Sequence, residues 1–405
     1  MDTQISNFLK ILKSVFDNQN ALLLEKPVEW EFLSKTARKQ NLLPLFFEAV
    51  SVREDYRNSD VFEKDQMDTF TMVAAQIQRS NAFLEIYKRF TDQGIFPIVI
   101  KGIVCRQLYG NLGEHRPSSD EDLLIEIKDF PKVKEILEEE NYICRIPDVT
   151  ERTLKQIQEV SFYHPEKKLH LEVHTNIIGK ESKERTRMNS LFQEVHHHGQ
   201  MIQIDGVDIK VMEATDSLLF LVLHAYKHFR GRGVGIRQVM DILLYYKTYR
   251  QEIVLKEFQK ALNTCRAENF WRDLLYIGNQ HLGLCEEEPE ECCSPEELMR
   301  DMMHAGVFGG QEKSDSTAAR INLMLEGSGR RQDSFNALFR AAFPPKQVLL
   351  AGYPSLEDYP WIMPVIWVKR WIKFLRYTGK DVWKVSKEIL EKSSARMELI
   401  KKYEK

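Results

Sequence analysis

The stretch Ser119-Asp120-Glu121-Asp122-Leu123-Leu124-Ile125 joins a run of acidic residues directly to an apolar run. Residues two apart on a β-strand point to the same face, so the pattern predicts a strand over 120–127 on which Asp120 and Asp122 project together while Glu121 points away. Two carboxylates that close repel each other unless a cation lies between them. Because Mg²⁺ binds one or two carboxylates together with substrate phosphate oxygens, we predict a divalent metal site at Asp120 and Asp122.

A third carboxylate is expected from a later strand. In Leu169-His170-Leu171-Glu172-Val173-His174 the odd positions are apolar and the even positions polar, which places His170, Glu172 and His174 on one wet face. If this strand lies beside 120–127, Glu172 faces the same cavity. We predict that it holds a metal ion or takes a proton from a reacting hydroxyl. For His174, contact with a substrate phosphate and a purely structural role both remain open.

Phosphate contacts are predicted just upstream. The apolar run 96–100 is expected to form a buried strand that leads into Lys101 and Gly102 at the start of a short helix over 103–109. A glycine there lets the backbone approach a phosphate, and the helix N-terminus offers free N–H groups. Arg116 and Ser119, on the polar loop 110–119, are expected to contact phosphate as well. Surface salt bridges are the alternative for Lys101 and Arg116.

The remaining pattern divides the chain into three regions: a helical region 1–92, a mixed region 93–215 and a helical region 216–405. We therefore predict an α+β fold with a short mixed sheet flanked by helices. The expected helices are 30–40, 44–50, 71–92, 130–140, 217–229, 237–249 and 382–403, the expected hairpins are 159–175 and 201–212, and 285–297 is expected to be an acidic linker.

Composition narrows the class of protein. The 405 residues carry a net charge of −3, with 43% hydrophobic and 29% charged residues, as in an ordinary soluble protein. We find no signal-peptide pattern and no apolar run long enough to cross a bilayer, and the six cysteines form no CxxC pair. These features favour a reduced, cytoplasmic protein without a membrane partner. The net charge argues against a surface that binds a long nucleic acid.

Several other motifs have plainer interpretations. Arg237 and Asp241 lie four residues apart on an expected helix, which favours a local ion pair over a role for Arg237 at a nucleotide. His224 and His228 have the same spacing, but no third zinc ligand is evident. The tract 196–198 is all histidine, yet on a strand at most two of the three could converge. The aromatic and basic segment 361–375 favours a helix packed on the protein over one on a membrane surface.

Taken together, these motifs resemble a known family, the uncharacterised bacterial nucleotidyltransferase-like family of the DNA polymerase β-like superfamily. The resemblance covers roughly 20–375. It is carried by Ile100-Lys101-Gly102, by Arg116 to Ile125, by Glu172-Val173-His174, by His224-x-x-x-His228-Phe229 and by Gly233 to Gln238 with Asp241.

This family implies a nucleotidyltransferase fold with a helical domain that helps to hold the nucleotide. It implies that Asp120, Asp122 and Glu172 bind Mg²⁺ or Mn²⁺. The implied reaction moves a nucleoside monophosphate from an NTP to an acceptor hydroxyl and releases pyrophosphate. The acceptor is a small molecule, a short RNA end or a protein. The residues expected around the nucleotide are Lys101, Gly102, Arg116, Ser119, His174 and Arg237.

The sequence departs from the wider superfamily at two positions and in one spacing. Ile103 follows Gly102 where a small residue is usual, Glu121 separates the aspartates where an apolar residue is usual, and the spacing from Gly102 to Asp120 is long. Two other classes therefore stay open: a catalytically degenerate nucleotide-binding module, and a helical interaction protein that uses the mixed region as a platform.

Overall fold

The computed structural model describes most of the chain. The described residues are 2–17, 22–146, 148–178, 183–231, 233–289, 291–306, 343–344, 346, 349, 353–356, 358–378, 396 and 398–403.

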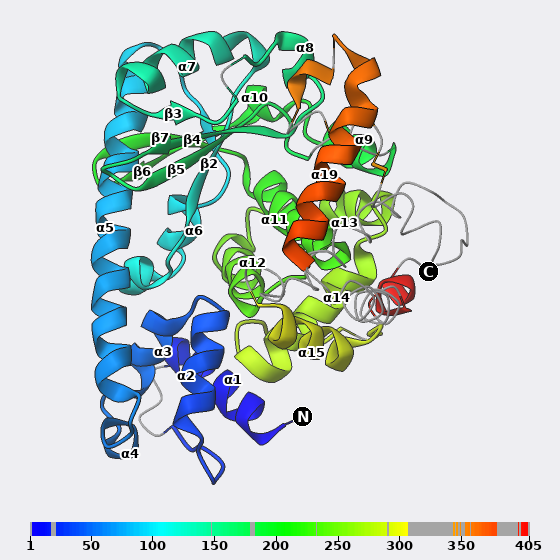
Figure 1. The fold of residues 1–405 in the computed structure, drawn as a ribbon. Helices are drawn as coiled ribbons and strands as arrows, with labels where there is room; N and C mark the ends of the chain where they lie inside the picture. Colours follow the sequence, from blue (N-terminus) through cyan, green and yellow to red (C-terminus); the bar gives the residue numbers. More distant parts are fainter. Residues whose placement is uncertain are drawn as a thin grey trace.

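The N-terminal helices lead into one long helix that runs along the molecule (Figure 1). They are α1 (Thr3–Asp17), α2 (Trp30–Lys39), α3 (Leu43–Val50), α4 (Glu54–Arg57) and α5 (Phe62–Asp92). Helix α5 begins at Phe62 and not at the predicted Thr71. Its polar first turns are held by tertiary bonds, because buried Asp65 accepts hydrogen bonds from Ser34 and Tyr56. Contacts of this kind override the weak local signal of a polar segment.

A seven-stranded mixed sheet forms the centre of the described structure, in the order β3-β4-β5-β2-β1-β7-β6. Its strands are β1 (Ile98–Val99), β2 (Asp120–Leu124), β3 (Ile143–Cys144), β4 (Glu159–His164), β5 (Leu169–His174), β6 (Gln200–Ile204) and β7 (Val207–Val211). Both predicted hairpins are confirmed as β4–β5 and β6–β7. The second turns at Asp205 and Gly206, both with positive φ, as a tight two-residue turn requires. The two-residue strand β3 was not predicted.

The two faces of the sheet have different partners. Leu169, Leu171 and Val173 of β5 lie in a core with α5 and with α7 (Phe130–Glu139). Side chains alternate along a strand, so His170, Glu172 and His174 project from the opposite face. On that face Leu124 of β2 belongs to the core that contains α11 (Ala214–Arg230). The acidic residues therefore lie on the side of the sheet that faces the C-terminal helices.

Short helical segments connect the strands. They are α6 (Ile103–Gln107), η1 (Gly110–His115), η2 (Ile127–Asp129), α8 (Glu151–Leu154), α9 (Lys183–Ser190) and α10 (Val195–His198). Two expectations change here. The predicted polar loop 110–119 contains a 3₁₀ segment, and the histidine tract lies on α10 and not on a strand.

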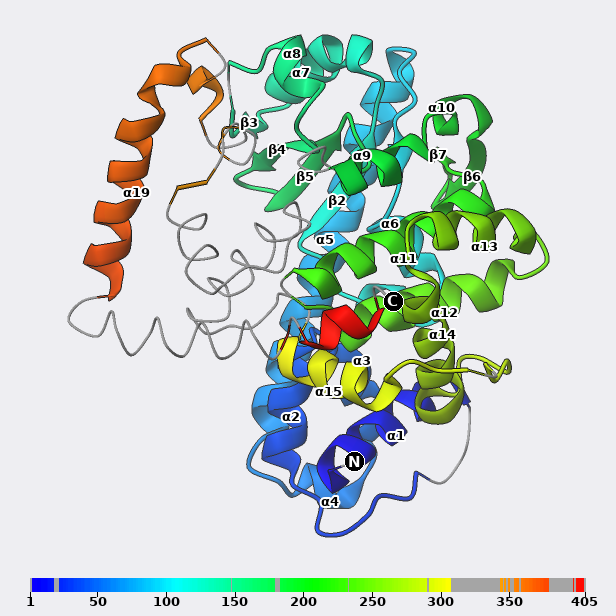
Figure 2. The ribbon, with the colours of Figure 1, turned by 90° about the vertical axis from the view of Figure 1, so that its right-hand side faces the viewer.

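The C-terminal helices pack against the N-terminal ones. They are α11, α12 (Ile236–Tyr249), α13 (Leu255–Thr264), α14 (Glu268–Ile277), η3 (Gly278–Leu282) and α15 (Pro295–Ala305). Phe8 and Leu12 of α1 share one core with Phe229 and Leu282, and α1 contacts η3 directly. The helical regions predicted at the two ends of the chain thus have a common core, although the boundaries at 92 and 215 stay a prediction. Figure 2 shows α1 beside α14 and α15.

A helix near the C-terminal end of the chain stands on a small core of its own. The helix α19 (Met363–Thr378) follows the 3₁₀ segments η4 (Pro354–Leu356) and η5 (Pro360–Ile362), and its Ile366 packs on Leu349 and Leu356. Trp361 and Val368 are exposed, so one face of the predicted packed segment 361–375 faces solvent. Most of the predicted helix 382–403 lies outside the described residues. None of the described helices is both long and apolar enough to span a bilayer.

Candidate metal centre

The register of β2 and β5 brings the predicted acids together. The two strands pair in parallel, with Asp122 opposite Glu172 and Asp120 opposite His170. The prediction of Glu172 as the third carboxylate required β5 to lie beside β2. The structure confirms this pairing of the strands. A shift by one residue would have turned Glu172 to the other face of the sheet.

Among the described residues, Asp122, Glu172 and His174 form a group of possible metal ligands. Ligand atoms of these three side chains lie within 4.8 Å of one another, so they could hold a metal ion. Nε2 of His174 is 3.0 Å from Oδ1 of Asp122 and 3.8 Å from Oε2 of Glu172. The side chains of Asp122 and His174 are buried, whereas that of Glu172 is 32% exposed and gives the group a side open to solvent. Asp120 lies one step further along the same face and is partly exposed.

The two facing carboxylates differ in their pKa values. Burial raises the pKa of Asp122, but Lys101 and His174 outweigh burial and bring this pKa well below its usual range. Burial also raises the pKa of Glu172, and with the negative charges of Asp122 and Glu159 it lifts this pKa to about 7. Repulsion between neighbouring carboxylates of this kind is relieved when a cation binds between them.

Lys101 links the acids to the helical domain. It follows β1, as predicted, and its Nζ lies 3.7 Å from Oδ2 of Asp122 and 3.1 Å from Nε2 of His224 on α11. Burial lowers the pKa of Lys101, but the surrounding negative charges, with that of Asp122 the strongest and those of Asp120 and Glu172 next, together outweigh burial and raise it. The ammonium group is therefore charged and lies next to the candidate metal ligands.

Glu121 fills the space under Gly102, where the sequence predicted a phosphate. Its carboxylate accepts a hydrogen bond of 2.7 Å from the N–H of Ile103 and one of 2.6 Å from Arg106, and both side chains of this pair are 1% exposed. Gly102 has φ +60°, and a Cβ added there would lie 1.8 Å from Oε2 of Glu121. The glycine is thus explained by the carboxylate beneath it, and the N–H of Ile103 is already occupied.

Arg116 and Arg237 also have internal partners. Arg116 donates two hydrogen bonds, of 2.8 and 2.6 Å, to the carboxylate of Asp241, which also accepts one from Tyr109. Arg237 donates to the carbonyl of Pro117. The predicted local pair of Arg237 with Asp241 is therefore replaced by a long-range pair of Asp241 with Arg116. This network fastens the loop before β2 to α12. The only indication of this network in the sequence was a single Asp on the buried face of a helix.

We expect Asp241→Asn to lower the free energy of unfolding by about 1–3 kcal/mol, because one buried charge-assisted bond to Arg116 is lost. Thermal and urea denaturation would measure this change. Asp205→Asn, on the exposed β6–β7 turn, is the matched control and should be neutral. Equal stability of the two variants would show that the Arg116 pair does not hold the loop.

The remaining predicted residues do not belong to this ligand group. Ser119 donates to Asp120 over 3.1 Å. His196, His197 and His198 belong to no metal group in the described part of the chain.

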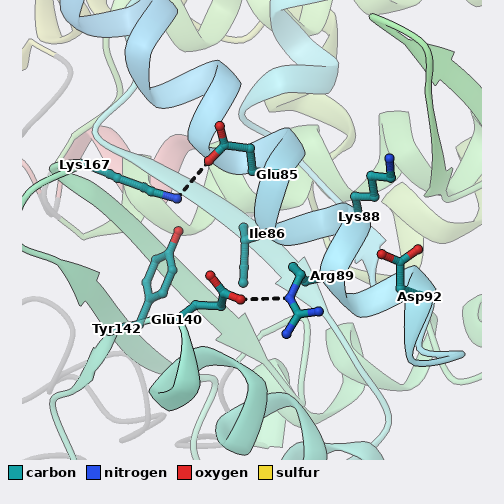
Figure 3. Close-up of a pocket in the computed structure, with 8 residues that line it drawn as sticks. All are labelled: Glu85, Ile86, Lys88, Arg89, Asp92, Glu140, Tyr142 and Lys167. Carbon is teal, nitrogen blue, oxygen red and sulfur yellow. Dashed lines mark hydrogen bonds and ion pairs between the residues drawn. The ribbon is translucent and has the colours of Figure 1, made fainter.

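A surface pocket of about 270 Å³ lies away from the metal ligands. It is lined by α5 residues such as Glu85 and Arg89 together with Glu140, Tyr142 and Lys167, on the opposite face of the sheet from Glu172 (Figure 3).

The mixed sheet with flanking helices has the architecture of a nucleotidyltransferase fold. A family model described as an uncharacterised nucleotidyltransferase matches residues 26–283. Since this match covers more than half of the chain, the protein belongs to that family, as the motifs predicted. No curated protein and no solved structure matches the chain.

Proposed function

We propose that the protein transfers a nucleoside monophosphate from an NTP to an acceptor hydroxyl and releases pyrophosphate. The observation that carries this proposal is the register of β2 and β5, which sets Asp122 directly opposite Glu172 beside Lys101. Family membership supports the reaction class. The acceptor is a small molecule, a short RNA end or a protein. We also propose that the protein works in the cytoplasm, as its pattern of cysteines predicted.

The donor set fits a divalent cation. Asp122 and Glu172 offer carboxylate oxygens within 4.8 Å, Asp120 lies on the same face, and Mg²⁺ and Mn²⁺ both prefer such oxygens. We assign these three acids as metal ligands. Bound there, the ion would neutralise phosphate charge and polarise the reacting oxygens.

The role proposed for His174 is to orient the carboxylate of Asp122. Burial lowers the pKa of His174, but its hydrogen bond to Asp122 and the negative charges of Asp122, Glu159 and Glu172 together outweigh burial and raise it. The imidazole therefore donates to Asp122 and holds that carboxylate in one orientation, as partners of metal ligands commonly do. His174 is a positioning residue in this proposal.

The reaction needs little covalent chemistry from the chain. The acceptor oxygen forms a bond to the α-phosphorus, the bond from that phosphorus to the bridging oxygen breaks, and pyrophosphate leaves with the electron pair. The hydroxyl proton passes to Glu172, whose carboxylate is the more exposed of the facing pair. Lys101 neutralises charge on the phosphates. Gly102, Arg116 and Arg237, predicted as nucleotide contacts, instead shape the loops around the site, with Ser119 beside Asp120.

One observation favours a second candidate. Because Glu121 already accepts the N–H of Ile103, the glycine loop has one donor fewer for a phosphate. A nucleotide-binding module without turnover would tolerate this loss. Tight NTP binding without pyrophosphate release across a broad panel of acceptors would favour that candidate over the transferase.

A thermal-shift screen of the four NTPs with Mg²⁺ or Mn²⁺ tests the proposal. An NTP at 100 times its dissociation constant should stabilise the native protein by about 2.7 kcal/mol. We expect at least one NTP to raise the melting temperature only when the metal is present. The same NTP should leave Asp122→Asn unchanged. If no NTP shifts the wild-type protein with either ion, the proposed function is wrong.

A further inference from the structure

Two histidines of α11 extend the charged row that begins at the acids. Nε2 of His224 lies 3.1 Å from Nζ of Lys101 and 2.8 Å from Nε2 of His228. Lys227, on the same helix, lowers the pKa of Asp122 by its charge, and its Nζ donates a hydrogen bond of 3.0 Å to Oε1 of Gln158. From Glu172 through Asp122 and Lys101 to the histidines, the side chains change from acidic to basic.

Among the described residues, the hydrogen bonds around His224 leave one buried nitrogen of its ring without a partner. Lys101 has only donors, so Nε2 of His224 must accept from it and the ring proton lies on Nδ1. Nε2 of His228 lies 2.8 Å from the same nitrogen. Nδ1 of His224 is buried and has no hydrogen-bond partner among the described residues. A buried donor without an acceptor is costly, and an anion would supply the missing acceptor.

A cation site does not explain the cluster. The ammonium group of Lys101, 3.1 Å from Nε2 of His224, would repel a zinc ion there. The described residues form one metal-ligand group, and neither histidine belongs to it. The partial negative charge at the C-terminus of α11 attracts basic side chains such as Lys227 and Arg230 to its last turn. That effect does not account for buried His224, a full turn earlier and in contact with Lys101.

We propose that Lys101, His224 and His228 form the subsite that binds the β- and γ-phosphates of the NTP and the pyrophosphate that leaves. This inference rests on the proposed function and names the half of the substrate that the acids do not hold. The transferred α-phosphate lies at Asp122 and Glu172, and the leaving group points along α11. The subsite supplies hydrogen-bond donors to the phosphates in place of the N–H of Ile103, which the glycine loop gives to Glu121.

Binding of a series of phosphate compounds tests the subsite. Inorganic tripolyphosphate, pyrophosphate and the four nucleoside monophosphates are titrated by calorimetry in the presence of Mg²⁺. His228→Gln is the main variant, because His228 is partly exposed and its replacement should not disturb the core. We expect tripolyphosphate and pyrophosphate to bind about tenfold more weakly, since one charge-assisted bond is lost. Binding of the monophosphates should not change.

His197→Gln, on α10, is the matched control and should bind every probe as the wild type does. Melting temperatures of both variants are measured, and His224→Gln provides a second replacement in the cluster. Wild-type affinity for tripolyphosphate in both the His228 and the His224 variant would overturn the subsite. An equal loss for monophosphates and tripolyphosphate would also overturn it, because that pattern indicates general damage.

The experiment separates this inference from the proposed function. Nucleotide transfer with unchanged tripolyphosphate affinity in His228→Gln would leave the transferase intact and remove the subsite. Tripolyphosphate binding that depends on His228, in a protein that transfers no nucleotide to any acceptor, would confirm the anion subsite and overturn the transfer reaction.

Discussion

Replacing Asp122 by Asn should reduce Mg²⁺-dependent pyrophosphate release at least about a thousandfold, which corresponds to about 4 kcal/mol of transition-state stabilisation. Asp122 is the acid that faces Glu172 in register and contacts Lys101 and His174. Asn keeps the shape but removes the charge that a divalent ion needs. The rate is measured with the NTP selected by the thermal-shift screen and a panel of acceptor hydroxyls.

A second measurement does not depend on the acceptor. Mn²⁺ affinity, followed by electron paramagnetic resonance, should fall in Asp122→Asn. Asp208→Asn makes the same substitution at an exposed position of β7 in the same sheet and should leave both quantities unchanged. Wild-type Mn²⁺ affinity together with full activity in Asp122→Asn would end the metal hypothesis.

The largest effect on stability is expected at the buried pair of Glu121 and Arg106. Glu121→Ala should lower the free energy of unfolding by about 3–5 kcal/mol, because it leaves the guanidinium of Arg106 buried without its counter-charge. Urea denaturation followed by tryptophan fluorescence measures this loss. A loss below about 1 kcal/mol would mean that the pair does not hold the loop between β1 and β2.

The same pair explains the glycine at position 102. Gly102→Ala should cost about 2–4 kcal/mol, from positive φ and from contact with Glu121. Gly110→Ala is the control, because Gly110 has φ +55° and nothing within 4 Å of a new Cβ. It should show the backbone cost alone. In the double variant Glu121→Ala, Gly102→Ala, the loss of stability should be about 1–3 kcal/mol smaller than the sum of the losses in the two single variants. Strict additivity would contradict the steric explanation.

Local pattern was enough to predict the elements that carry the site. The apolar run after the acidic residues predicted β2, and alternation of apolar and polar residues predicted β5. The faces of Glu121 and Glu172 followed, because side-chain direction on a strand has a period of two. The turn at Asp205 and Gly206 was equally readable. The motifs around these strands also identified the family that the match to residues 26–283 confirms.

The partners of charged residues were not readable from the sequence. The sequence spacing of Arg237 and Asp241 favoured a local pair, yet Asp241 binds Arg116 from a loop 125 residues away in the chain. Glu121 belonged to the same acidic run as its neighbours, but the structure buries it against Arg106 and Gly102. Such pairings depend on which elements meet in space, and no local period encodes that.

Local pattern in the chain was sufficient to predict the two acidic strands, the direction of their side chains and the family. The pairing of β5 with β2, in the register that sets Asp122 opposite Glu172, is visible only in the folded protein. Only the packing of α11 on the acid-bearing face brought His224 to Lys101. The physical reason is that strand direction is a local property of the chain, whereas register and helix packing depend on burying apolar surface contributed by distant segments.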